Sequence, residues 1–258
     1  MTTADRATAL RTLHTDPALL RLVNVWDVAS ARVVAAVPGT TALATASHAI
    51  AAMYGYEDGE RIPRDLMLEA VGRVVDAVDL PVTADLEAGY GDAAETVRRA
   101  IGLGVVGANI EDQLRPLPEA ARIVEQVMAA ADAEGVPDFV LNARTDAVIL
   151  AGDRDPAEAL ADAIERGRAF LDAGAPVVFV PGRLDEEQVV QVVDAFGPQR
   201  LSLIPIPGAV LPDRLEELGV ARISFGPFAQ RAALTALQVM AEDVQRGGGI
   251  PEGTRNLT

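Results

Sequence analysis

The chain has 258 residues, half of them hydrophobic, which suits one large folded domain and excludes an intrinsically disordered protein. Acidic residues outnumber basic residues by 38 to 22, and the formal charge of −16 makes nucleic acids and anionic membranes poor partners. Lysine and cysteine are absent, which excludes Schiff-base and P-loop lysines, thiol nucleophiles and cysteine-bound zinc. No apolar run is long enough to span a membrane and the N-terminus lacks the apolar core of a signal peptide, so we expect a cytoplasmic protein.

The chain opens with a candidate helix around Thr3–Leu13 and then alternates short apolar runs with longer stretches of helical period. This alternation predicts parallel strands joined by crossover helices. The predicted strands are Leu22–Val25, Thr41–Thr45, Pro81–Asp85, Gly107–Ile110, Phe139–Ala143, Val177–Val180, Leu201–Ile204 and Arg222–Phe225. The predicted helices are Val28–Ala36, Pro63–Ala77, Ala93–Leu103, Pro118–Glu134, Pro156–Ala173, Glu186–Phe196, Leu211–Leu218 and Pro227–Gln245.

Eight strand–helix units match a (β/α)₈ TIM barrel in number and length. A doubly wound open sheet is the alternative, because periodicity does not report whether a sheet closes. We expect a single barrel domain over residues 1–246, including the N-terminal helix, and a polar tail over 247–258.

Acidic side chains follow the second, third and fourth predicted strands. Asp85 and Glu87 are two positions apart, so their side chains point to the same side while the strand persists. Glu111 follows the neighbouring strand, and Asp58 lies in the loop after the second strand. Four converging carboxylates would repel one another, and a divalent cation is their natural neutraliser. With only two histidines in the chain, oxygen ligands would have to hold the cation, which favours Mg²⁺ or Mn²⁺, although any single acid could instead be a surface residue.

Other residues at this edge have both a structural and a functional interpretation. Arg144 could pair with Asp146 or the acidic cluster, or could grip a substrate carboxylate. His48 could be a packed residue or an acid–base catalyst, and Tyr90, between two glycines, a turn residue or a catalyst. Trp26 could pack at the barrel mouth or form the wall of a ligand pocket. The remaining candidate substrate-binding residues are Asp27, Ala46, Ser47 and Asn142.

Three motifs span the ends of the third, fourth and fifth predicted strands: Asp85-Leu86-Glu87-Ala88-Gly89-Tyr90-Gly91, Gly107-Ala108-Asn109-Ile110-Glu111-Asp112-Gln113 and Asn142-Ala143-Arg144-Thr145-Asp146. These motifs resemble those of the isocitrate lyase/phosphoenolpyruvate mutase superfamily. Three further stretches, at 24–27, 44–59 and 218–226, keep the same order, so the resemblance spans about residues 20 to 245.

The resemblance implies a metal-dependent barrel that binds a 2-oxo acid and stabilises its enolate. It assigns Mg²⁺ to Asp85, with water-linked support from Asp58, Glu87 and Glu111. It also assigns the substrate carboxylate to the backbone amides of 46–48, and a substrate contact to Arg144. By similarity, the helix Pro227–Gln245 would pack onto a neighbouring subunit in a homodimer or homotetramer.

The sequence departs from the superfamily where lyases carry a Lys-Lys-Cys-Gly-His gating loop. Here the loop is Leu114-Arg115-Pro116-Leu117-Pro118, which has no lysine or cysteine and leads straight into a helix. Trp26 stands where some lyases have an aromatic hydroxyl, and Pro181 where the mutase has a histidine. The metal half of the site is therefore expected to be intact and the proton-delivery half to be altered, with a metal-bound water, Tyr90 or His48 as the candidate acid.

We therefore expect a Mg²⁺-dependent lyase or decarboxylase that cleaves a carbon–carbon bond of a small 2-hydroxy or 2-oxo di- or tricarboxylate. One alternative is phosphorus–carbon bond chemistry on phosphonopyruvate or phosphoenolpyruvate. The other is a 2-oxo-acid-binding protein without turnover.

Overall fold

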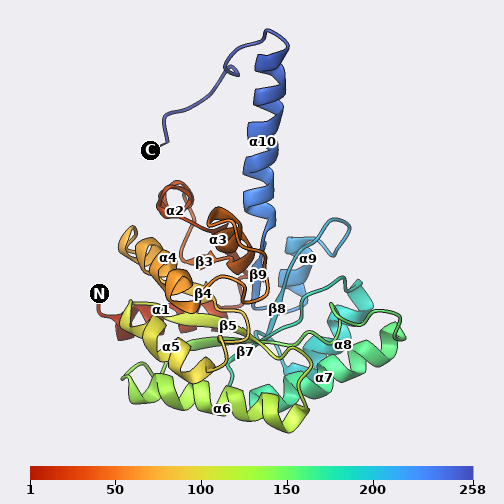
Figure 1. Ribbon diagram of the computed structural model, residues 1–258. Coiled ribbons are helices and arrows are strands. Elements are labelled where there is room, and N and C mark those ends of the chain that lie inside the picture. Colours follow the sequence, from red (N-terminus) through yellow and green to blue (C-terminus); the bar gives the residue numbers. More distant parts are fainter. Residues whose placement is uncertain (258) are drawn as a thin grey trace.

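The computed structural model describes residues 1–257 as parallel strands surrounded by helices (Figure 1). The strands are β1 (Leu20–Leu22), β2 (Asn24–Val25), β3 (Leu43–Thr45), β4 (Val82–Asp85), β5 (Gly107–Glu111), β6 (Val140–Arg144), β7 (Val177–Phe179), β8 (Leu201–Leu203) and β9 (Arg222–Ser224). Every neighbouring pair is parallel, and the order is β1-β9-β8-β7-β6-β5-β4-β3-β2. The order runs in one direction without a switch point, and its two ends are consecutive in the chain. The fold is therefore a nearly closed TIM-type barrel, and the open-sheet alternative is wrong.

The first predicted strand is two segments in the structure. Segment β1 pairs with β9 and segment β2 pairs with β3, and Val23, which lies between β1 and β2, is exposed. Asn24 joins the two sides of this seam. Its amide nitrogen donates to the carbonyl of Thr45 at 2.8 Å, and its Oδ1 accepts from the backbone nitrogens of Phe225 (2.6 Å) and Gly226 (2.8 Å). This one buried side chain thus connects the first strand of the barrel, formed by β1 and β2, to the last strand, β9.

The chain also forms helices, most of which cover the outside of the barrel. They are α1 (Thr3–Thr15), α2 (Val28–Ala35), α3 (Ser47–Met53), α4 (Arg64–Asp76), α5 (Ala93–Gly102), α6 (Leu117–Ala133), α7 (Pro156–Asp172), α8 (Glu186–Phe196), α9 (Pro212–Glu217) and α10 (Phe228–Gln245). The predicted helices are confirmed to within two residues at each end. Helix α3 was not predicted, because seven residues make fewer than two turns and give too short a window for helical periodicity.

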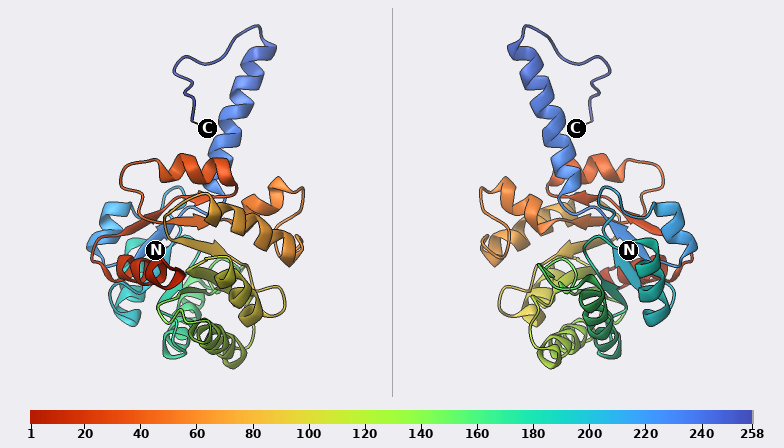
Figure 2. Two further views of the ribbon diagram at one scale, coloured as in Figure 1. Left: turned by 90° about the vertical axis from the view of Figure 1, so that its left-hand side faces the viewer. Right: turned by 90° about the vertical axis from the view of Figure 1, so that its right-hand side faces the viewer.

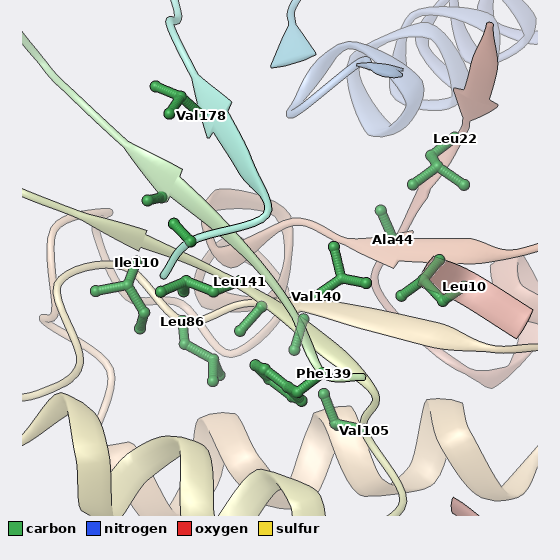
Figure 3. Packing of buried hydrophobic residues seen from close by; sticks show 14 of the residues in the cluster. Leu10, Leu22, Ala44, Leu86, Val105, Ile110, Phe139, Val140, Leu141 and Val178 are labelled. Atoms are coloured by element: carbon green, nitrogen blue, oxygen red, sulfur yellow. The ribbon is translucent and has the colours of Figure 1, made fainter. Parts of the chain in front are cut away.

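Apolar residues of the strands alternate with polar residues that point into the barrel. Ile110 and Leu141 point outward and pack with the buried residues beneath the helices, as Figure 3 shows. Their sequence neighbours Asn109 and Asn142 point inward and bond to each other at 2.8 Å. The main core therefore lies between barrel and helices, and much of the barrel interior is polar.

The N-terminal end of the barrel is closed by α1. A Cβ at Gly107 would lie 2.9 Å from the Leu10 side chain and 2.8 Å from the Val140 carbonyl oxygen, so only glycine lets α1 approach β5 this closely.

Helix α10 leaves the barrel and projects away from it (Figure 2). All residues from 231 to 239 are exposed, including the apolar Leu234, Leu237 and Val239, each more than half exposed. Only its first turn is anchored, where the buried Gln230 donates to the Ala49 carbonyl at 2.9 Å. The tail from 247 contains no helix or strand as far as Leu257, and Thr258 lies outside the described residues. Within residues 1–257, no helix is both long and apolar enough to cross a membrane.

Candidate active site at the barrel mouth

A cavity of about 230 Å³ opens at the carboxyl ends of the strands. The predicted site residues that line it are Ala46, Ser47, His48, Asp58, Asp85 and Arg144. They come from the start of α3 and its N-cap, the loop after α3, β4 and β6, so strands and loops distant in sequence build one wall. Five of the six residues are polar, and for these the expected convergence at one edge of the barrel holds.

Asp85 ends β4 and lies in the wall of this cavity. Its Oδ2 accepts from the backbone nitrogen of Ser47 at 3.1 Å and from the Ser47 hydroxyl at 2.8 Å. Its own backbone nitrogen donates to the Thr45 hydroxyl at 3.0 Å. The two bonds from Ser47 fix the orientation of the carboxylate, and the bond to Thr45 holds the Asp85 backbone to the end of β3. The Ser47 amide, which the resemblance assigns to a substrate carboxylate, is here bonded to Asp85.

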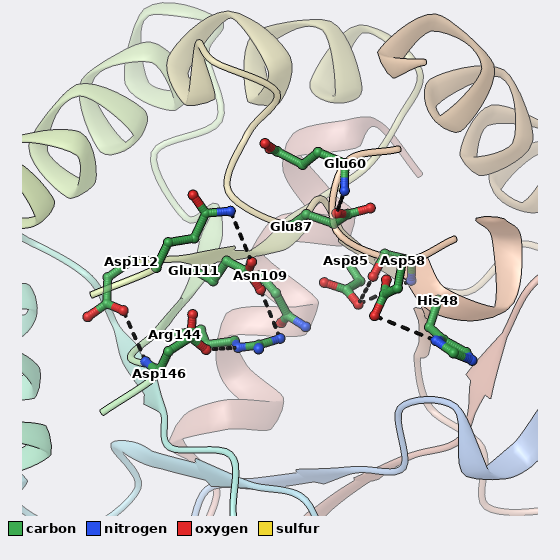
Figure 4. A network of polar contacts seen from close by, with 12 residues as sticks. His48, Asp58, Glu60, Asp85, Glu87, Asn109, Glu111, Asp112, Arg144 and Asp146 are labelled. Carbon is green, nitrogen blue, oxygen red and sulfur yellow. Dashed lines mark hydrogen bonds and ion pairs between the residues drawn. The ribbon is translucent and has the colours of Figure 1, made fainter. Parts of the chain in front are cut away.

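Glu87 is buried beside Asp85, with only 3% of its surface exposed (Figure 4). It accepts hydrogen bonds from the Glu60 backbone nitrogen and from the Tyr90 hydroxyl, the latter at 3.1 Å. Burial, and next the charge of Asp85, raise the pKa of Glu87 to about 7. Glu60, Glu87 and Tyr90 all have positive φ angles of 53° to 60°, a conformation that costs free energy in residues with side chains and is common at functional sites.

Arg144 lies between two carboxylates at the end of β6 (Figure 4). Its Nη1 is 3.0 Å from Glu111 and its Nε 2.7 Å from Asp146, and Asp146 is almost completely buried. Burial raises the pKa of Glu111 to about 7 against the opposing charge of Arg144, with further upward contributions from Asp146 and Asp85. The pairing of Arg144 with acids is therefore confirmed, and the guanidinium also lines the cavity, where its contact with a substrate stays a prediction.

Asp112 and Arg166 hold the loop that stands where lyases have their gate. Asp112 accepts from the backbone nitrogens of Leu114 and Asp146, both at 3.0 Å, and pairs with Arg166 at 3.1 Å. Arg166 also donates to the Arg115 carbonyl at 2.9 Å. Since α6 begins at Leu117, the segment after β5 is a short pinned turn, as its sequence indicates.

The acidic residues fit a hard divalent cation by their chemistry. Among residues 1–257, no three histidine or acidic side chains lie close enough together to form a complete ligand set. Mg²⁺, however, keeps several waters and needs few direct protein ligands. Asp85 and Asp58 line the cavity, and the charge of Asp85 acts on both Glu87 and Glu111. Asp85 is thus the residue around which oxygen donors could hold Mg²⁺ or Mn²⁺.

The other predicted residues have the following positions. Nδ1 of His48 lies 3.5 Å from Asp58 at the cavity rim. Asn142 is fully buried below the cavity, and Tyr90 faces Glu87. Asp27 caps α2 by accepting from the Ser30 backbone nitrogen at 2.7 Å, and Trp26 packs against the core beside it. Trp26, Asp27, Glu87, Tyr90, Glu111 and Asn142 are not among the residues that line the cavity.

Several cavity residues were not predicted, among them Asn24, Asn109, Phe179, Ser224 and Arg231. The alternation of β5 could have revealed Asn109, which lies two positions before Glu111 and therefore on the same face. No local signal marks Arg231, because it lies in the second turn of α10 and reaches the cavity only through the fold.

The sequence matches the family model described as phosphoenolpyruvate phosphomutase over residues 10–245. The chain belongs to this family. Membership places it in the isocitrate lyase/phosphoenolpyruvate mutase superfamily and confirms the resemblance seen in its motifs.

Relatives of this family member match over most of its length. An uncharacterized protein of Mycobacterium tuberculosis is 31% identical, covering 93% of this chain and 90% of the relative. The phosphoenolpyruvate phosphomutase of Streptomyces hygroscopicus is 29% identical, covering 96% and 83%. The oxaloacetate decarboxylase of a Bradyrhizobium strain is 27% identical, covering 100% and 91%. A solved structure from Burkholderia cenocepacia J2315 has a TM-score of 0.85 at 38% identity, covering 95% and 100%. Named relatives thus include both a mutase and a decarboxylase.

Proposed function

We propose that the protein is a Mg²⁺- or Mn²⁺-dependent carbon–carbon lyase or decarboxylase acting on a small 2-hydroxy or 2-oxo di- or tricarboxylate. The observation that carries this proposal is a single cavity lined by Asp58 and Asp85 together with Arg144 and Arg231. Acids that can hold a cation and guanidinium groups that can bind a carboxylate are the two elements that an enolate of a 2-oxo acid requires.

In this proposal Asp85 binds the cation directly, and Asp58, Glu87 and Glu111 support it through water. When bound, the cation supplies electrostatic stabilisation of the enolate charge that develops as the carbon–carbon bond breaks. The hydrogen bonds from Ser47 keep the Asp85 carboxylate in a single orientation.

Arg144 binds the substrate carboxylate. Its Nε and Nη1 are engaged by Asp146 and Glu111, while Nη2 has no partner among residues 1–257. The two acids therefore fix the plane of the guanidinium and leave one edge for a ligand. Arg231, whose guanidinium lies 5.5 Å from the Phe228 ring centroid, adds a second positive charge at the rim.

His48 is our choice for the group that moves a proton. It lines the cavity, and Asp58 can orient its ring. Tyr90 is less suited, since burial and the adjacent charge of Glu87 raise its pKa well above the usual range and its hydroxyl already donates to Glu87.

We also propose that α10 packs against a second copy of the chain in a homodimer or homotetramer. Support comes from the exposed apolar residues of α10, which leave the helix without a covering surface in the monomer. Light scattering of the intact protein and of a Leu234→Asp, Leu237→Asp variant tests this, and an unchanged assembly in the variant would contradict it. The cytoplasmic location stays a prediction from composition.

Incubation with Mg²⁺ and a panel of 2-hydroxy diacids, oxaloacetate and phosphonopyruvate tests the reaction. Pyruvate, glyoxylate, carbon dioxide and phosphate are followed, and the Asp85→Ala variant and a chelator serve as controls. We expect metal-dependent release of a 2-oxo acid without phosphate. Phosphate release from phosphonopyruvate would instead support the phosphorus–carbon alternative, which Pro181 in the cavity wall and the lysine-free loop disfavour. Saturable 2-oxo-acid binding with no product would support a binding protein.

A further inference from the structure

A second cavity, of about 380 Å³, lies at the opposite, N-terminal end of the barrel. Its walls are the last turn of α1, the turn between α7 and β7, and the residues that precede β8. Because all strands are parallel, the ends of β7 and β8 that border this cavity are the ends farthest from the mouth. The cavity is therefore separate from the candidate active site.

This lower cavity carries positive charge in a strongly acidic protein. Arg11 and Arg200 both line it, and none of its lining residues is acidic. Within residues 1–257, neither guanidinium has a carboxylate oxygen within 4.0 Å or a hydrogen-bond acceptor. Asp138, the acid whose charge reaches Arg11, is bonded to the Thr8 hydroxyl at 2.6 Å. Two guanidinium groups without a carboxylate partner thus line one cavity that has no acidic wall residue.

The inner wall adds two buried groups with unused polar atoms. His14 is 1% exposed; its Nδ1 lies 2.8 Å from the Leu10 carbonyl, and its Nε2 has no partner among the described residues. Arg222 is fully buried, and its positive charge reaches His14. Its Nε and Nη1 lack partners in the part of the chain that the structure describes. The positive charge of the cavity is thus continued into the barrel interior.

We propose that the lower cavity binds a small dianionic oxyanion, a phosphate group or a short dicarboxylate, between Arg11 and Arg200. Guanidinium groups bind such oxyanions through paired charge-assisted hydrogen bonds. The volume suffices for a phosphate group or a four-carbon diacid, and the absence of lining acids removes the repulsion that such a ligand meets elsewhere on this surface. The ligand would bridge α1 to the segment before β8 and so stabilise the closed lower end of the barrel.

Isothermal titration of the full chain with sodium phosphate, succinate and chloride at matched ionic strength tests the proposal. We expect saturable binding of phosphate or succinate, and the stronger of the two identifies the ligand class. Affinity should fall about tenfold in Arg11→Gln and in Arg200→Gln, and further in the double variant. Arg32→Gln, an exposed arginine on α2, is the matched control and should bind like the wild type.

Binding at the mouth is separated from binding at the lower cavity by Arg231→Gln, which removes a mouth guanidinium and should leave the lower site unchanged. The proposal is overturned if no saturable binding occurs, if chloride competes equally at matched ionic strength, or if the double variant retains wild-type affinity. These measurements use no turnover, so they stand or fall independently of the proposed reaction.

Discussion

The two ends of the barrel interior have opposite charge. At the mouth, the charge of Asp85 acts on both Glu87 and Glu111, and Arg144 pairs with Glu111 and with Asp146. Deeper in the barrel, Arg222 crosses from β9 to within 3.4 Å of the Asn109 side chain on β5, and among residues 1–257 no carboxylate forms an ion pair with it. A buried charge without a partner costs free energy, so each end is stabilised by what it binds or by the field of the other. The sign of the excess charge at each end of the barrel, more than the presence of a cavity, therefore indicates which kind of ligand that end binds.

The largest expected effect comes from removing the central acid of the mouth. Asp85→Ala should weaken Mn²⁺ or Mg²⁺ binding by more than about 100-fold, because the carboxylate that lines the cavity and whose charge acts on both Glu87 and Glu111 is lost. Titration calorimetry measures the affinity, and Glu125→Ala, an exposed acid on α6, is the matched control. Full retention of cation affinity by Asp85→Ala would remove the charge contrast between the two ends.

The loss of folding stability at acid pH tests the positive charge at the lower end of the barrel. Burial, and next the charge of Arg222, lower the pKa of His14 to about 3, so the folded protein keeps this histidine neutral. The unfolded chain takes up the proton near pH 6.5, and stability is therefore lost as pH falls from about 6.5 towards 3. Between pH 7 and pH 5 this loss amounts to about 2 kcal/mol.

The contributions of Glu87 and Glu111 to the unfolding free energy depend on pH in the opposite direction. Their folded-state pKa values of about 7 lie above the usual range, so their contribution is present below about pH 4.5 and is lost as pH rises through 7. The difference in unfolding free energy between wild type and His14→Gln isolates the histidine, since the glutamates are common to both. We expect denaturant titrations to show that the change in unfolding free energy from pH 5 to pH 7 is more positive in wild type than in His14→Gln by about 2 kcal/mol, with His48→Gln as the control. Equal slopes in wild type and His14→Gln would show that His14 is not held neutral.

The sequence predicts the fold well because buried parallel strands appear as short apolar runs. The alternation of apolar and polar residues and the ends of the predicted strands also identify Asp85 and Arg144, because the position of each depends only on its own strand. The hydrogen bonds of Asn24 to the end of β9 and the position of Arg231 at the cavity could not be predicted. Each depends on contact between the first and last strands of the barrel, which are about 200 residues apart in sequence. The hydrogen bond from Ser47 to Asp85 likewise joins two separate elements, α3 and β4. A one-dimensional pattern fixes which residues face inward, but not which of them touch.

Replacing the mouth guanidinium should have a smaller effect. Arg144→Lys keeps the charge and loses the planar fork held by Glu111 and Asp146, so we expect the affinity for a 2-oxo acid such as pyruvate, in the presence of Mg²⁺, to fall about tenfold. Arg154→Lys, which alters a surface pair with Asp162, should leave it unchanged. Equal affinity in Arg144→Lys and wild type would assign Arg144 to structural ion pairing alone.

The smallest effect, and the one that links the two ends, concerns Arg222. Burial lowers the pKa of Arg222 to about 10, against the opposing field of Asp85, so the guanidinium is charged at neutral pH. Its charge therefore partly offsets the negative charge that attracts a cation at the mouth. Arg222→Met, of similar length and without charge, should tighten divalent-cation binding by about threefold, with little loss of stability because no ion pair is broken.

Titration calorimetry with Mn²⁺ at pH 8, compared with the exposed Arg32→Met, measures this effect. Thermal unfolding of the same samples separates an electrostatic change from loosened packing. If Arg222→Met bound the cation more weakly while remaining folded, Arg222 would be supporting the geometry of Asn109 and the mouth rather than opposing its charge, and the two ends would be coupled through packing instead of through the field.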